Sequence, residues 1–188
     1  KRSYAPLLVA TFQDQNDNVE IWLVNDHHEP YDARVRVQVR GFDGRLQKEE
    51  TFTVQVPAGG TALVHTYQLN ELVAKKNEGF LYATVETGRE TNYTTHFFTE
   101  YKRCELPRAA ISTSIEEVSG GYAVTLKSNQ PAFFVSADVQ GVPGEFSDNF
   151  FTLLPGEPRT ITFTPKRATS LAEVRSALTV KHLRDTYR

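Results

Sequence analysis

Paired carboxylates are the first residues in this sequence that could do chemistry. Adjacent acidic residues occur at Glu49-Glu50 and at Glu116-Glu117. Hydrolysis of a glycosidic bond needs two carboxyl groups facing each other across the bond, roughly 5–5.5 Å or 6.5–9.5 Å apart. Both pairs lie in alternating, strand-like sequence, where neighbouring side chains point to opposite faces. We therefore expect solvated carboxylates at strand ends and not a catalytic pair.

The segment Asp26-His27-His28-Glu29-Pro30 has the residue types of a metal site. Its spacing matches no zinc signature, because such signatures separate the ligands so that their side chains can converge. A polar loop that ends a strand at Pro30 is the favoured interpretation. We assign no catalytic residue, no cofactor-binding residue, no metal ligand and no cofactor to this sequence.

The remaining reactive side chains are also expected to be structural. His65, His96 and His182 lie in strand-like patterns and are interpreted as surface or packed histidines. Cys104 is the only cysteine, so no intrachain disulfide can form. It has no histidine nearby, and we expect an inert thiol near the middle of the chain.

Trp22 is the only tryptophan, and an exposed aromatic ring can bind sugars by stacking. It alternates with Ile21 and Leu23, so its strand phase allows it to face outward. No second aromatic residue at fixed spacing completes a stacking platform. We favour packing in a core or between domains, and carbohydrate binding is the alternative.

Composition and charge are those of an ordinary globular protein, with 39% hydrophobic residues, 23% charged residues and a net charge of −2. This charge predicts no nucleic-acid and no membrane partner. Arg34, Arg36 and Arg40 alternate with valines and are interpreted as the solvated face of a strand. No apolar run is long enough to cross a membrane as a helix.

The sequence contains no methionine, even at position 1, which suggests a processed or excised piece. Leu7 to Ala10 is too short for the apolar core of a signal peptide. The single cysteine leaves the cellular compartment open. Asn92-Tyr93-Thr94 matches the N-glycosylation pattern, which is common by chance.

Alternating apolar and polar residues run through most of the chain, with Gly, Asn and Asp turns between the alternating segments. This pattern predicts strands, and we expect an all-β fold of two tandem immunoglobulin-like antiparallel β-sandwiches. The apolar faces that define the strand phase are Val19/Ile21/Leu23, Phe52/Val54/Val56, Leu81/Ala83/Val85 and Tyr122/Val124/Leu126.

Two segments have helical patterns. Leu69 to Lys76 predicts a short helical turn. Ser170 to Glu173 predicts a capping box, in which the serine caps an early N–H and the glutamate reaches back. Leu171, Val174 and Leu178 extend that helix by a turn or two. Neither is long enough for a crossover helix, so a parallel sheet is not expected.

The domain boundary is placed between Lys102 and Arg108, where Leu106-Pro107 interrupts the strand pattern. We expect an immunoglobulin-like sandwich over 1–107 with about seven strands. A second sandwich with roughly six strands is expected over 108–188.

The stretch from Gly144 to Pro158, GEFSDNFFTLLPGEP, is distinctive. It resembles the C-terminal immunoglobulin-like module of β-mannosidases, in the β-galactosidase/β-glucuronidase/β-mannosidase clan of glycoside hydrolases. Gly121 to Leu126 and Leu183 to Tyr187 are similar to the same module. Tyr4 to Val9 and Val19 to Asp26 resemble the penultimate β-sandwich of these enzymes.

This resemblance implies a non-catalytic region that packs on and supports a catalytic barrel, which hydrolyses terminal β-mannosides with retention. The family's acid/base and nucleophile glutamates lie in that barrel, upstream of these modules, so no residue here inherits those roles. The implied partners are the barrel and the mannoside substrate, and a bacterial parent would favour a periplasmic or secreted location. Alternatives are a carbohydrate-binding module and an adhesin-type tandem of immunoglobulin-like domains.

Overall fold

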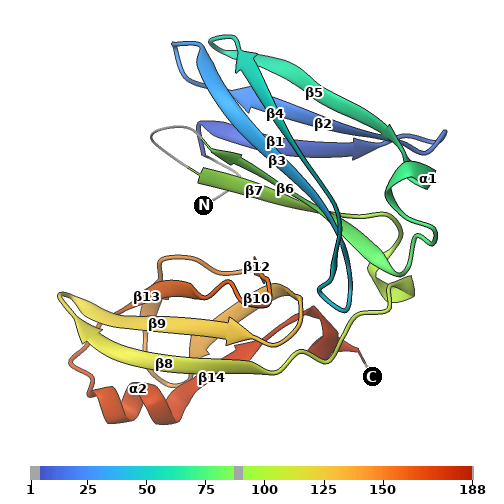
Figure 1. Cartoon of the computed structure of the whole chain (residues 1–188). Helices are drawn as coiled ribbons and strands as arrows, with labels where there is room; N and C mark the ends of the chain where they lie inside the picture. Colours follow the sequence, from blue (N-terminus) through green and yellow to red (C-terminus); the bar gives the residue numbers. More distant parts are fainter. Residues whose placement is uncertain (1–4, 87–90, 188) are drawn as a thin grey trace. The chain divides into compact units, whose positions relative to one another are not determined.

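The computed structural model describes residues 5–86 and 91–187. The chain divides into two compact units, Lys1–Glu105 and Leu106–Arg188. Each unit consists of two antiparallel sheets (Figure 1). The predicted all-β class with two tandem immunoglobulin-like sandwiches is confirmed. Within the described residues, no helix is long and apolar enough to cross a membrane.

The first unit pairs a three-stranded sheet, β1-β2-β5, with a four-stranded sheet, β4-β3-β6-β7. The strands are β1 (Leu7–Gln13), β2 (Asn18–Asn25), β3 (Tyr31–Gly41), β4 (Leu46–Val56), β5 (Gly60–Gln68), β6 (Gly79–Glu86) and β7 (Thr91–Phe97).

The core of the first unit follows from the alternation of these strands. Val19, Ile21 and Leu23 on β2 are fully buried, as the sequence predicted. The valines of β3 and alternate residues of β6 belong to the same hydrophobic cluster. The arginines that alternate with the β3 valines therefore lie on the opposite face of that sheet.

The second unit pairs β12-β10-β14 with β11-β13-β9-β8. Phe151, Leu153, Ile161 and Phe163 are each at most 2% exposed and form part of its core. The strands are β8 (Ile111–Val118), β9 (Gly121–Ser128), β10 (Ala132–Val139), β11 (Gly144–Phe146), β12 (Phe151–Leu153), β13 (Arg159–Pro165) and β14 (Leu178–Lys181).

The first helical segment is shorter than the sequence predicted, and the second has the predicted one to two turns but ends one residue early. Helix α1 (Leu69–Leu72) ends four residues before the predicted end at Lys76. Helix α2 (Leu171–Ala177) ends before Leu178, which begins β14 because it pairs with Val139 of β10. Two 3₁₀ turns complete the description, η2 (Tyr101–Arg103) and η3 (Leu183–Thr186).

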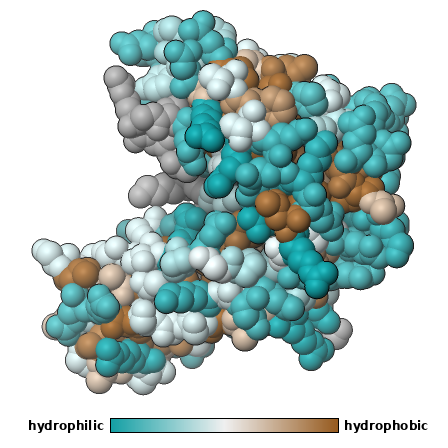
Figure 2. All heavy atoms as spheres, viewed as in Figure 1, coloured by the Kyte–Doolittle hydropathy of each residue, from teal (hydrophilic) through white to brown (hydrophobic). Residues whose placement is uncertain are grey.

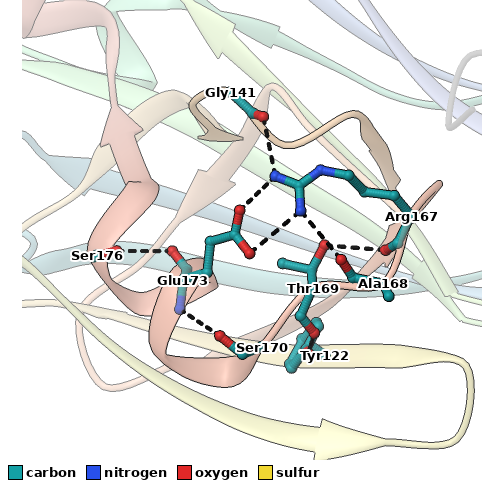
Figure 3. Close-up of polar contacts among 8 residues, drawn as sticks. All are labelled: Tyr122, Gly141, Arg167, Ala168, Thr169, Ser170, Glu173 and Ser176. Carbon is teal, nitrogen blue, oxygen red and sulfur yellow. Dashed lines mark hydrogen bonds and ion pairs between the residues drawn. The ribbon is translucent and has the colours of Figure 1, made fainter.

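The start of α2 confirms half of the predicted capping box. The hydroxyl of Ser170 accepts a hydrogen bond from the N–H of Glu173 at 3.2 Å. The Glu173 carboxylate forms an ion pair with Arg167 (Figure 3), and this pairing takes the place of the expected bond back to the cap. The sequence pattern could not show this competing cation, because it comes from the preceding loop.

The segment between the units is tied to the first of them. The N–H of Glu105 donates to the carbonyl of Asn77 at 2.9 Å. The division of the structure falls between Glu105 and Leu106, two residues before the expected end of the first sandwich at 107. The boundary at 107/108 remains a proposal.

Candidate functional site

The three-stranded sheet of the first unit has an apolar side that faces away from the core. We define the outer apolar face as these side chains, which alternate with core residues along each strand: Leu8, Ala10, Phe12, Trp22, Val24 and Leu63.

The strand register brings these side chains together. Ala10 lies opposite Trp22, and Trp22 lies opposite Leu63, so three strands contribute to one row. Directly opposed side chains on one face have Cβ atoms about 4.5–5.5 Å apart. Phe12 is 58% exposed and Leu63 is 46% exposed. In Figure 2 hydrophobic residues gather over the first unit in the region of β5, with hydrophilic residues around them.

Trp22 lies outside the core of its own unit. Its indole Nε1 donates to Glu20 Oε2 at 2.8 Å, and its side chain is half-buried. The sequence favoured packing in a core or between domains. Trp22 does not pack in the core of its unit, whereas packing between domains and carbohydrate binding stay predictions.

The carboxylate pairs do not converge. Glu50 points toward the core side, where it accepts a hydrogen bond from the Tyr67 hydroxyl, whereas Glu49 accepts one from the Gln38 amide. Burial, together with the Glu50 carboxylate, raises the pKa of Tyr67 well above its usual range. Glu116 and Glu117 are exposed neighbours on β8 and point to opposite sides. In neither pair can the two carboxylates act on the same substrate atom.

The loop from Asp26 to Pro30 is organised by the side chain of Asn25, which is completely buried. Asn25 Nδ2 donates to the carbonyls of Glu29 at 2.8 Å and Pro57 at 3.0 Å, while its Oδ1 accepts from the N–H of His27. Among the residues that the structure describes, no three His, Cys, Asp or Glu side chains gather as a metal site requires.

His96 joins the edge strands of the two sheets. Its Nε2 lies 3.0 Å from Gln13 Oε1 and its Nδ1 lies 3.2 Å from Thr11 Oγ1. These partners suit a neutral ring that donates through Nε2 and accepts at Nδ1. Burial lowers the pKa of His96 to about 4.

Nearby on β7, the amide of Asn92 is buried and donates to the carbonyl of Leu7, so the N-glycosylation acceptor is covered in the folded unit.

The other sequence-predicted residues make ring or hydrogen-bonding contacts within their units. The His65 ring stacks on Phe52 at 5.1 Å between ring centres, and His182 Nε2 lies 3.3 Å from the Ala109 carbonyl. Cys104 is 7% exposed, and burial raises the pKa of its thiol to about 11. An inert thiol is what the sequence predicted.

The second unit has a surface hollow of about 320 Å³ beside the loop that precedes α2. Both terminal nitrogens of Arg167 bond to the Glu173 carboxylate, and one also donates to the carbonyl of Ala168 at 3.1 Å (Figure 3). The Tyr122 hydroxyl donates to the Thr169 carbonyl. These contacts fix the loop and the start of α2, and they pair no nucleophile with a base.

The part of the distinctive stretch that connects β11 to β12 holds strand β10. Asn149 bonds the Ala137 backbone twice, since Oδ1 accepts from the N–H at 2.8 Å and Nδ2 donates to the carbonyl at 3.2 Å. Asp148 pairs with Arg159 at 2.6 Å. The side chains of Asp148 and Asn149 therefore serve packing.

Two family models match the chain in succession. Residues 17–103 match the model described as a mannosidase Ig/CBM-like domain, and residues 106–186 match the model of the Ig-fold domain of mannosidases. One match falls in each unit of the structure, and the first begins after β1.

Curated relatives match over nearly the whole chain. The β-mannosidase of Bos taurus is 30% identical over 98% of the chain, and that of Rattus norvegicus is 27% identical over 100%. The chain spans 22% of the length of each.

Among solved structures, the β-D-mannosidase of Dictyoglomus thermophilum aligns with a TM-score of 0.81, 22% identity and 97% of this chain, which is 22% of that protein. The exo-chitosanase CsxA of Amycolatopsis orientalis aligns over 96% of this chain and 26% of its own, with a TM-score of 0.66 and 16% identity. These two likenesses show the fold. The two family models and the curated relatives establish that the chain belongs to the C-terminal immunoglobulin-like modules of the β-mannosidase family, with one such module in each of its two units.

Proposed function

We propose that the chain is the non-catalytic C-terminal region of a retaining β-mannosidase and that it packs on and supports a catalytic barrel. The observation that carries this proposal is the order of the two mannosidase modules across 17–186, together with the alignment of nearly the whole chain to part of the curated β-mannosidases. The substrate of the complete protein would be a terminal β-mannoside.

The local chemistry supports a structural role. The carboxylate pairs point apart, and the polar contacts of the second unit fix loops and strand ends. Retaining hydrolysis needs an acid and a nucleophile about 5–5.5 Å apart. In the proposed protein, a barrel elsewhere in the polypeptide supplies both groups.

Activity measurements on three proteins test this proposal. The 188-residue chain, the full product of its reading frame and that product without these 188 residues are assayed with an aryl β-mannoside. We expect activity in the full product, none in the chain alone, and a less stable or less active protein after the deletion. A full product without activity, or an upstream sequence without a barrel, would refute the proposal.

A carbohydrate-binding module is the second candidate, and the outward position of Trp22 is the observation that favours it. Calorimetry with β-mannan fragments separates the two functions. Micromolar binding that Trp22→Ala abolishes would support the module, whereas a structural region binds such fragments weakly or not at all.

A further inference from the structure

The strands behind the outer apolar face have the sequence pattern of strands that are covered on both sides. Leu7 to Ala10 and Ile21 to Val24 are unbroken apolar runs. Strands with one solvated face alternate, whereas strands buried on both faces have near-continuous hydrophobic runs. Strand β3 is the internal contrast, because arginines fill its outward positions at 34, 36 and 40. Only one side of β1 and β2 packs on the core of the unit.

The side chains of this face suit a protein surface. Leu8, Val24 and Leu63 are aliphatic. Their side chains offer none of the hydrogen-bonding groups that a bound sugar would need. On β2, the charged side chain of Glu20 points to the same side as Trp22. Its carboxylate accepts a hydrogen bond from the Trp22 indole. A dry, apolar contact of this kind is typical of a stable interface between domains, and its aromatic residues are the usual anchors.

The length of the relatives and the position of β1 indicate what covers this face. The chain spans 22% of the length of the curated β-mannosidases, so each has several times as much further polypeptide. Strand β1 is an edge strand of this sheet. Polypeptide that precedes β1 in a longer protein therefore joins the sheet at a strand whose outward side chains, Leu8, Ala10 and Phe12, belong to the outer apolar face.

We propose that the outer apolar face is the docking surface for the catalytic part of the polypeptide. This inference rests on the proposed function and names the surface that carries it. Phe12, Trp22 and Leu63 are the anchors, and they are buried in the complete protein.

Hydroxyl-radical footprinting tests this surface in the full reading-frame product against the 188-residue chain. Labelling of Phe12, Trp22 and Leu63 should fall at least about threefold in the full product, as burial of an interface core requires. Leu46 on β4 is 48% exposed, slightly more than Leu63, and its labelling should stay unchanged. Equal labelling of Phe12 and Trp22 in both proteins would refute the proposal.

A matched pair of variants in the full product gives a second test. Leu63→Asp should lower the melting temperature and weaken aryl β-mannosidase activity, whereas Leu46→Asp should change neither. Equal effects of the two substitutions would overturn the assignment of the surface. An active full product with an unprotected face would refute this surface alone, whereas an inactive full product would refute the proposed function.

Two other possible occupants of the outer apolar face would give different footprinting results with the 188-residue chain alone. Protection of Phe12 that grows with protein concentration, with dimers in sedimentation, would assign the face to a second copy. Protection by β-mannan fragments would assign it to carbohydrate. Either result would overturn docking to the catalytic part.

Discussion

His96 should make the stability of the first unit depend on pH. Its ring is held neutral between Thr11 and Gln13, and its pKa of about 4 lies below the ordinary histidine value of about 6.5. Between these two values the unfolded chain binds a proton that the folded unit does not. The contribution to stability is therefore complete above pH 6.5 and is lost as the pH falls toward 4.

We expect the first unit to lose about 2 kcal/mol of unfolding free energy between pH 7.5 and pH 5 from this group. Denaturant titrations followed by tryptophan fluorescence measure this loss, because Trp22 is the only tryptophan and lies in the first unit. His96→Gln should remove most of the difference, whereas His28→Gln, at an exposed position, should leave it. If the unfolding free energy of His96→Gln fell with pH as steeply as that of the unchanged protein, the pH dependence could not be assigned to His96.

Cys104 should be almost unreactive in the folded protein. Burial raises the pKa of its thiol to about 11, so the reactive thiolate is scarce at pH 8. Labelling with a maleimide should be at least about a hundredfold slower in native than in denatured protein. Labelling at the same rate in both states would show that the segment around Cys104 is open to solvent.

At the scale of elements, β12 offers a matched pair of phenylalanines. Phe151 is completely buried, whereas Phe150 just before it is 65% exposed. Phe151→Ala should destabilise the second unit by about 3–5 kcal/mol, because it leaves a cavity in the core. Phe150→Ala should cost less than about 1 kcal/mol. Calorimetric melts of both variants measure the difference, and equal losses would mean that the strand phase is wrong.

The strand phase was predictable because alternation is local. Val124, Leu126, Phe151 and Ile161 are buried where two-residue periodicity places them. Strand order is not local: β13 pairs with both β9 and β11, although β12 precedes it in the chain. The end of α2 was mispredicted for the same reason, since pairing with β10 decides the conformation of Leu178.

Backbone strain was equally invisible to the sequence pattern. Phe134 and Phe150 have positive φ angles of 51° and 58°, a region that residues with a β-carbon rarely adopt. A shift in strand register between Ala132 and Val135 accounts for the irregular backbone around Phe134. A sequence gives no sign of such a shift unless glycine or asparagine marks it.

At the scale of the molecule, the outer apolar face is the part of the candidate site that sequence reasoning missed. Its signal was present in the unbroken runs Leu7 to Ala10 and Ile21 to Val24. Because β1 and β2 pair along their whole length, both runs contribute to one surface. Only the pairing reveals it.

The two-unit organisation predicts that the halves fold separately, and Leu106 locates the join. Leu106 is 7% exposed, and the structure assigns it to the second unit, whereas the sequence boundary at 107/108 would exclude it. We expect fragments 1–105 and 106–188 each to unfold in one cooperative transition. Fragment 108–188 should be less stable than 106–188 by about 1.5–3 kcal/mol, the value of one buried leucine side chain. Calorimetry of the three fragments measures this difference.

Equal stability of the two C-terminal fragments would support the boundary at 107/108. The loss of cooperative unfolding in both halves would show that neither unit folds alone.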